Sequence, residues 1–178
     1  MTSPLVSPTE LTNYQNGDPE LAIAIATGRI RDYCGWHITP SVTEAITVDG
    51  PCSDVLTLPT LYLTAVSSVV EEGVTIAEED FDWSDSGYLR RRRCRWTGKP
   101  RGIIVGITHG YAEVPPAVKA AALALASLAQ TPASAASSQA AGPYSVQLTT
   151  RSDGTAGGAY MPDDVADMLA PYRIHGVA

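Results

Sequence analysis

The sequence lacks the features that mark several large protein classes. It has no run of about 18 consecutive apolar residues, so it predicts no membrane-spanning helix. Its first residues lack the charged and apolar regions of a signal peptide, so it predicts no secretion signal. Its three cysteines show no paired spacing, and an odd number of this kind favours a reducing compartment over a disulfide framework.

The charge balance is acidic, with a formal net charge of −7 over 178 residues. A general nucleic-acid binder depends on lysine and arginine to neutralise phosphates, so this balance argues against that class. It remains compatible with a protein past which DNA moves without adhering. The length suits one domain with a core, or one domain and an arm.

Three helices are predicted in the first 131 residues, because apolar residues recur there with helical spacing between start and stop signals. The clearest starts are Asp18-Pro19 and Pro115-Pro116, which supply a cap and the fixed backbone angle of a first turn. Gly35 ends one of these helices, and the other must stop before Pro132. The predicted helices span residues 8–14, 18–35 and 115–130.

Between the second and third helices, apolar residues alternate as they do in β-strands. Residues 103–108 show this best, because isoleucine and valine occupy every second position. We expect Trp83 and Trp96 to pack in the core or across strands. The other expected strands are 42–48, a kinked or edge strand within 55–63, a hairpin of 66–70 with 74–76, and a pair of 81–83 with 87–90.

Beyond residue 131 the composition changes. Residues 133–142 are rich in alanine, serine and glutamine without an apolar stripe, which predicts a linker. Residues 144–148 alternate as a short strand without an obvious partner, and a short helix is predicted over about 162–170. We expect this C-terminal arm, residues 132–178, to dock on another surface. A chain truncated at Gly142 is expected to keep its fold.

The predicted fold class is therefore α+β. A small helical bundle carries an inserted antiparallel β-sheet or small barrel at about residues 38–109, and residues 1–131 form the core of the protein. The arm extends from this core.

Catalytic and metal-binding alternatives find little support. Cys34-x-x-His37 could be combined with Cys52, Cys94 and His109 as a zinc site, but structural zinc sites usually bring two close pairs of ligands. A thiol nucleophile, Cys34 or Cys94 with His109 as its base, lacks any local signature, and no phosphate-binding loop is present. We expect no enzyme activity, no cofactor and no metal.

The main charge feature is the arginine run at residues 90–95, which holds five of the twelve basic residues. As a strand it would alternate its side chains between two faces. An acidic stretch precedes it, so the run can pair within the chain or between neighbouring subunits, and exposed pairs of this kind act mainly on register and specificity. Contact with DNA is a third interpretation. The acidic residues of this stretch are Glu71, Glu72, Glu78, Glu79, Asp80, Asp82 and Asp85.

Several segments taken in order resemble the head-to-tail adaptor, or connector, proteins of long-tailed bacteriophages that infect actinobacteria. They are Ile30-Arg-Asp-Tyr-Cys-Gly-Trp36, Leu58-Pro-Thr-Leu-Tyr-Leu-Thr-Ala-Val-Ser-Ser-Val69, Gly87-Tyr-Leu-Arg90 and Thr108-His-Gly-Tyr111, within residues 8–130, together with Leu169-Ala-Pro-Tyr-Arg-Ile174 in the arm.

The resemblance implies a structural virion protein of the head-to-tail neck, made in the host cytoplasm. It implies a ring of identical subunits, twelve-fold like the portal, that extends the DNA channel and docks the next neck or stopper protein. Double-stranded DNA would pass through without sequence-specific binding. The alternatives are another neck or tail-completion protein, or a DNA-binding packaging protein that uses the arginine run.

Two groups of residues are the expected contact sites of such an adaptor. The expected subunit contacts are Arg90, Arg91, Arg92, Arg93 and Arg95 with Glu78, Glu79, Asp80 and Asp82. The expected portal-docking residues of the arm are Tyr144, Val146, Leu148, Met168, Leu169, Tyr172, Arg173 and Ile174.

Overall fold

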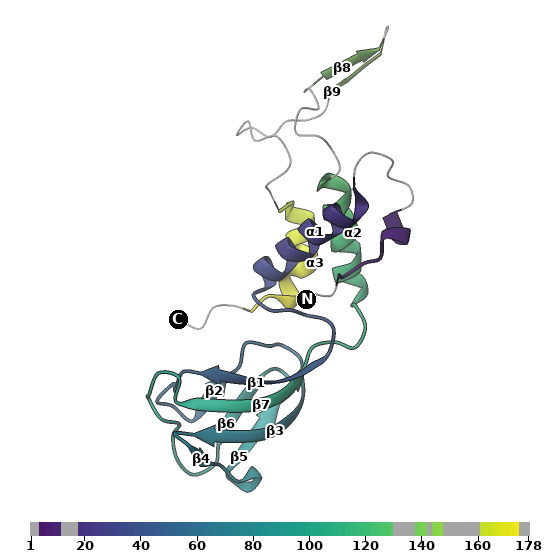
Figure 1. Ribbon diagram of the computed structural model, residues 1–178. Coiled ribbons are helices and arrows are strands. Elements are labelled where there is room, and N and C mark those ends of the chain that lie inside the picture. The colour runs from purple at the N-terminus through teal and green to yellow at the C-terminus, as the bar shows by residue number, and fades with distance from the viewer. Residues whose placement is uncertain (1–3, 12–17, 130–137, 142–143, 148–160, 175–178) are drawn as a thin grey trace. The chain divides into compact units, whose positions relative to one another are not determined.

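The computed structural model describes residues 4–11, 18–129, 138–141, 144–147 and 161–174. The chain divides into two compact units, each built from two separate segments. Residues 1–30 and 116–170 form the helical unit, and residues 31–115 and 171–178 form the β unit. The described residues confirm the α+β class, because they form three α-helices and two small antiparallel sheets, with a separate two-stranded hairpin (Figure 1).

The helices follow their predicted start and stop signals. The helices α1 (Pro19–Cys34) and α2 (Pro116–Ala129) lie within two residues of their predicted bounds. An Asp18 carboxylate oxygen accepts the N–H groups of Glu20 and Leu21 at 3.0 and 3.5 Å, so this residue caps α1 as expected. No described helix combines the length and the hydropathy needed to cross a membrane.

The helical unit packs α2 against a third helix and against a short 3₁₀ turn. The turn η1 (Pro8–Leu11) occupies the start of the helix predicted over 8–14, and the rest of that prediction lies outside the described residues. The third helix, α3 (Asp163–Leu169), continues into the 3₁₀ turn η3 (Ala170–Tyr172). The buried side chains of α2 and α3 are Val118, Ala121, Ala122, Leu125, Ala126, Val165 and Leu169.

The β unit is a sandwich of two antiparallel sheets, and among its described strands no barrel closes. The first sheet has the strand order β1-β7-β3-β4 and the second has the order β2-β6-β5 (Figure 1). The strands are β1 (Val42–Val48), β2 (Val55–Thr57), β3 (Leu63–Glu71), β4 (Val74–Thr75), β5 (Phe81–Ser84), β6 (Tyr88–Arg91) and β7 (Ile103–His109).

Alternation along the strands places one set of side chains between the two sheets. On β7, residues Ile103, Val105 and Ile107 are fully buried, whereas Ile104 is exposed. Trp96 is also buried in this core, which confirms its prediction. Trp83 differs, because it lies at a sheet edge on β5 and is 40% exposed.

The arm contains one hairpin that the sequence did not predict correctly. Strand β9 (Tyr144–Gln147) pairs in antiparallel register with β8 (Ser138–Ala141). The strand predicted over residues 144–148 is thus present over 144–147, and β8 is the partner that was not obvious from the sequence. Residues 138–141 form a strand where a linker was predicted. Strand pairing uses backbone groups, so a segment of alanine, serine and glutamine can enter a ladder without any apolar stripe.

Candidate interaction surface

The arginine run begins on a strand and ends in a loop. Strand β6 ends at Arg91, so the strand alternation expected over residues 90–95 is wrong beyond that point. The Arg92 N–H group donates to the Asp80 carbonyl at 3.0 Å, in register with the β5–β6 pairing, and the chain leaves the ladder after this bond. It returns to the sandwich where the Trp96 N–H group donates to the Ser53 carbonyl at 2.8 Å. Residues 92–95 therefore form an exposed basic loop.

Two arginines of the run form exposed ion pairs within the chain. Arg90 Nε lies 3.1 Å from a carboxylate oxygen of Asp54. Arg92 binds Asp82 through two hydrogen bonds, of 3.1 and 2.6 Å. The hydrogen bond from Arg92 lowers the pKa of the Asp82 carboxyl, and the same bond raises the pKa of Arg92. Pairing within the chain, one of the expected alternatives, is thus present for these residues.

Arg91 lies inside the sandwich. Its side chain is 8% exposed and is paired with the Glu71 carboxylate, while its guanidinium lies 4.6 Å from the centroid of the Trp96 ring. The second carboxylate oxygen of Glu71 accepts the Thr97 N–H group at 2.6 Å. Arg91 was expected to contact a neighbouring subunit; alternation on β6 turns its side chain inward, between exposed Arg90 and Arg92.

The remaining charges of the predicted contact set have no ion pair with any described residue. Arg93 and Arg95 are exposed on the basic loop. Glu78, Glu79 and Asp80 form the 3₁₀ turn η2 (Glu78–Asp80), which has no buried residue. The β unit thus presents one basic loop and one acidic turn whose side chains are available to a partner of opposite charge.

Most of the arm residues described after α3 are bound to their own chain. The Tyr172 carbonyl accepts the Trp36 indole N–H at 2.7 Å, and the Ile174 N–H group donates to the Cys34 carbonyl at 2.9 Å. The Arg173 guanidinium lies 5.0 Å from the ring centroid of Tyr33.

The predicted portal-docking residues accordingly fall into different environments. Leu169 is fully buried, so it is not a surface residue of the described chain. Met168 is 40% exposed, and Arg173 is exposed as well. Tyr144 and Val146 lie on β9, whereas Leu148 lies outside the described residues.

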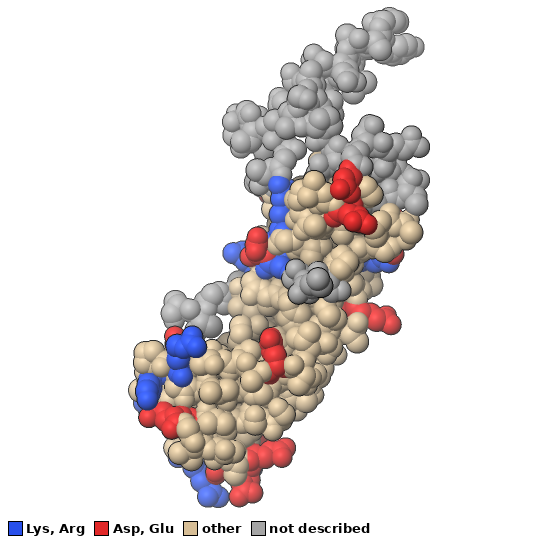
Figure 2. All heavy atoms as spheres, viewed as in Figure 1, with Lys and Arg blue, Asp and Glu red and all other residues tan. Residues whose placement is uncertain are grey.

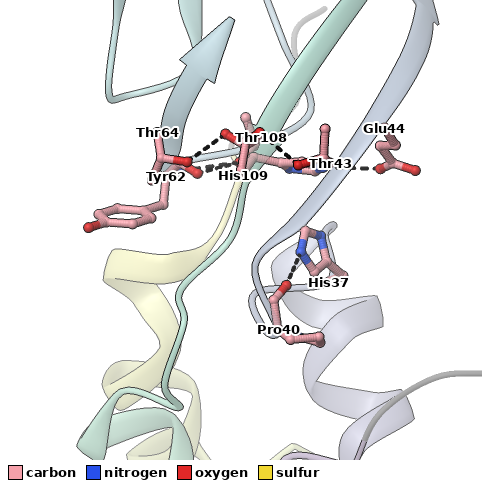
Figure 3. A network of polar contacts seen from close by, with 9 residues as sticks. His37, Pro40, Thr43, Glu44, Tyr62, Thr64, Thr108 and His109 are labelled. Atoms are coloured by element: carbon pink, nitrogen blue, oxygen red, sulfur yellow. Dashed lines mark hydrogen bonds and ion pairs between the residues drawn. The ribbon is translucent and has the colours of Figure 1, made fainter. Parts of the chain in front are cut away.

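The sequence did not reveal a group of histidine and tyrosine side chains at one end of the first sheet. The rings of His37 and His109 meet edge to face with centroids 4.6 Å apart, and the rings of Tyr62 and Tyr111 stack at 4.2 Å. Figure 3 shows Glu44 on β1 reaching His109 Nε2 on the adjacent β7, a distance of 3.0 Å. The pairing of residues 44 and 109 could have been anticipated only from the register of β1 with β7.

Gly110 is required next to these histidines. Its φ of 92° is left-handed, which glycine adopts readily and other residues rarely do. A Cβ at this position would lie 2.5 Å from His37 Nε2 and 2.8 Å from the Pro40 carbonyl oxygen. The Thr-His-Gly-Tyr motif thus ends β7 with a turn that closely approaches the loop after α1.

Acid should weaken the β unit through His37. Burial lowers the pKa of His37, and the neighbouring His109 lowers it further. When folding depresses the pKa of a histidine, the neutral ring is favoured in the folded state. The free energy of unfolding is then fully retained above the unfolded-state pKa of about 6.5, and it decreases as the pH falls through the folded-state pKa. We expect His37→Gln, whose amide can still donate to the Pro40 carbonyl, to make unfolding free energy less dependent on pH between 7.5 and 5. Denaturant titrations at several pH values measure this dependence, and identical slopes in both proteins would contradict it.

The three cysteines lie in different environments. Cys34 is buried, and burial raises the pKa of its thiol to about 11, so it stays protonated at neutral pH. Cys52 and Cys94 are exposed. Among the described residues, no three histidine, cysteine or acidic side chains are grouped as metal ligands would be.

The fold is similar to those of two chains from solved particle necks. One comes from a structure described as the neck of a native GTA (gene transfer agent) particle computed with C12 symmetry, with a TM-score of 0.61, 14% identity, and coverage of 100% of this chain and 97% of that chain. The other comes from the neck of an empty GTA particle computed with C6 symmetry, with a TM-score of 0.58, 15% identity, and coverage of 98% and 92%. The TM-scores show a shared fold, and at these low identities the comparisons show the fold alone. No family profile and no curated protein matches the sequence.

Proposed function

We propose that this chain is a structural neck component of a phage-like particle, and within the neck a head-to-tail adaptor. The observation that carries the proposal is the fold similarity to a GTA neck chain over 100% of this chain and 97% of that chain. The ordered sequence segments that resemble phage adaptors support the same conclusion independently. An adaptor of this kind needs no cofactor and no enzymatic activity.

The adaptor would form a ring beneath the portal, with twelve subunits if its symmetry follows the C12 neck. Neighbours in a ring meet through two different surfaces, so each subunit needs two complementary patches. The basic loop carrying Arg93 and Arg95 and the acidic turn of residues 78–80 are complementary in charge and adjoin where the Arg92 N–H group donates to the Asp80 carbonyl. In this proposal the loop contacts one neighbour and the turn contacts the other. Arg90, Arg92 and Asp82, already paired within the chain, would lie beside this contact.

The arm would dock on the portal. Strand β9 with Tyr144 and Val146, the following Leu148, and the exposed Met168 and Arg173 are the proposed contacts. Leu169, Tyr172 and Ile174 would support this surface through their bonds and packing within the chain. The net charge of −7 suits the wall of a channel, because it repels the phosphates of passing DNA. The next neck or stopper protein would dock on the ring.

Co-purification with the portal protein of the same genome tests the adaptor assignment, followed by electron microscopy of the complex. We expect a closed ring of this protein on the narrow end of the portal. If both proteins are folded and do not associate, the adaptor role is wrong. A ring bound instead to a tail component would indicate another neck or tail-completion protein.

Charge reversal tests the subunit contact. Arg93→Glu with Arg95→Glu should prevent ring closure, because the basic loop would then face an acidic turn of the same sign. We expect the fraction of chains in rings, measured by mass photometry, to fall about tenfold or more, a change equivalent to about 1.4 kcal/mol. Circular dichroism should be unchanged, because both side chains are exposed.

Two further variants make this test specific. Lys99→Glu with Arg101→Glu introduces the same change in net charge on exposed residues outside the loop, and should leave rings intact. Adding Glu78→Lys and Glu79→Lys to the reversed loop should restore ring closure. If the four-residue swap stays monomeric, the pairing of loop with turn is wrong.

A DNA-binding packaging protein is the second candidate, favoured by the unpaired Arg93 and Arg95. It predicts retardation of duplex DNA whose affinity falls steeply with salt, with a slope set by the number of phosphate contacts. Absence of retardation at moderate salt would remove this candidate.

A further inference from the structure

Strand β1 is a free edge of the four-stranded sheet. It pairs with β7 over seven consecutive residues without a bulge, and no other described strand pairs with it. The opposite edge of the same sheet, β4, is only two residues long. Proteins usually protect long edges with prolines, lysines, bulges or short strands, because an open edge pairs readily with another strand.

Hydrogen bonds around β7 establish which backbone groups of β1 point outward. The Thr108 carbonyl accepts the Thr64 hydroxyl at 2.9 Å, and the Gly110 N–H group donates to the Tyr62 carbonyl at 2.9 Å. The even-numbered residues of β7 thus direct their backbone groups toward β3, and the odd-numbered ones direct theirs toward β1. The β1 residues left with outward N–H and C=O groups are the partners of the even-numbered residues, namely Thr43, Ala45 and Thr47.

The surroundings of this edge carry little charge. Glu44 is the only charged residue of β1, and its carboxylate is bound to His109. The neighbouring exposed face of the sheet carries threonine, serine and alanine side chains and Ile104. In Figure 2, the region of this sheet is covered mainly by uncharged atoms, with most charged side chains toward its margins. An incoming strand would therefore need to be uncharged as well.

The chain itself contains such a strand. The β8–β9 hairpin pairs with neither of the two sheets, and residues 138–147 include no charged residue. A two-stranded hairpin alone is marginally stable in water, so its strands gain from joining a larger sheet. Each strand of the hairpin has one edge that its partner does not cover. Strand β9 carries the residues proposed to contact the portal, so β8 is the strand whose edge remains available to another sheet.

We infer that the β8 strand of one copy adds to the β1 edge of a second copy and extends its four-stranded sheet. The inference rests on the proposed ring, because contacts in a ring join two different surfaces. Pairing of β1 with β1 would instead be two-fold and would close a dimer. An uncharged strand meeting an edge whose one charged residue, Glu44, is bound to His109 also suits copies that each carry a net charge of −7 and repel one another elsewhere.

Cysteine cross-linking between copies tests the contact. In full-length protein with Cys52→Ser and Cys94→Ser, a chain carrying Ala45→Cys is mixed with a chain carrying one cysteine at positions 138–141. We expect disulfide-linked dimers from the mixture for at least one of these positions, and none from Ala45→Cys alone. Dimers from Ala45→Cys alone would show β1–β1 pairing. An internal cross-link in the doubly substituted chain, without dimers in the mixture, would show docking within one chain. Either result overturns the inference.

A proline substitution identifies the edge itself. Ala45→Pro removes an outward N–H group that the fold does not use. With the β1 cysteine moved to position 47, this change should reduce its cross-linking to the β8 cysteine of a second copy about tenfold, because a backbone hydrogen bond is lost and the pairing is disturbed. Thr75→Pro on the opposite edge strand β4 is the matched control. The Ile76 N–H group donates to the Val69 carbonyl, so the N–H group of the preceding residue, Thr75, points outward. Cross-linking should persist in this variant. Equal losses in both variants, with circular dichroism unchanged, would contradict the edge assignment.

The outcomes separate this inference from the proposed function. Closed rings on the portal without any cross-link would leave the adaptor proposal intact and refute the strand addition. Cross-linked copies that form no closed ring would support strand addition and contradict the ring.

Discussion

Arg91→Met should be the most destabilising single change in the arginine run. The substitution keeps a long side chain against Trp96 but leaves the Glu71 carboxylate in a largely buried position without its ion pair. Removing one partner of a buried ion pair costs about 3–5 kcal/mol. In a unit of this size the melting temperature should fall by more than about 10 °C, a shift measurable by calorimetry.

Two controls separate burial from charge. Arg90→Met removes the same charge from the neighbouring position, but its ion pair with Asp54 is exposed, so the melting temperature should barely change. Arg91→Met combined with Glu71→Gln removes both charges and keeps an acceptor for the Thr97 N–H group. This double variant should recover much of the lost stability. Equal effects of Arg90→Met and Arg91→Met would show that Arg91 is not a buried anchor.

The arginine run illustrates what sequence could predict and what it could not. The strand period and the nearby acidic stretch predicted both an alternation of faces and pairing within the chain or between chains. Sequence could not show that the strand stops at Arg91, because that depends on where the partner strand begins, and β5 begins at Phe81, opposite Arg91. It also could not show which arginine faces the core. That depends on Leu89, which is fully buried and therefore places Arg91, two residues on, on the same inner face.

The helices were predictable because their signals are local. Asp18 caps α1, and α2 begins at Pro116, directly after Pro115, with its apolar stripe buried as expected. The histidine and tyrosine group was missed for the opposite reason. His37 and His109 are 72 residues apart in sequence and meet only through the register of β1 with β7.

The arm shows the same limit. Its short helix was predicted nearly correctly from a proline start and an apolar pattern. The sequence did not show that α3 packs on α2 of its own chain. A chain ending at Gly142 would therefore lose the buried Val165 and Leu169, so the expectation that this truncation keeps its fold is not supported for the helical unit.

Leu169→Ala should accordingly destabilise the helical unit. The side chain is fully buried at the end of α3, and truncating a buried leucine to alanine costs about 2–5 kcal/mol because apolar contacts are lost and a cavity remains. Denaturant unfolding followed by circular dichroism measures the change. The adjacent Met168 is 40% exposed, so Met168→Ala is a matched control that should unfold at almost the same denaturant concentration as the unsubstituted chain.

The same two variants distinguish folding from docking. If the arm binds the portal through its exposed side chains, Met168→Ala should weaken portal binding while stability is retained. Leu169→Ala should reduce binding only to the extent that the helical unit unfolds, so lowering the temperature should restore binding of Leu169→Ala but not of Met168→Ala. If Met168→Ala binds the portal normally, the exposed end of α3 is not part of the docking surface, and the proposed contact would have to lie on β9 and Arg173. If Leu169→Ala is as stable as the unsubstituted chain, α3 does not hold the helical unit together, and truncation at Gly142 would be tolerated after all.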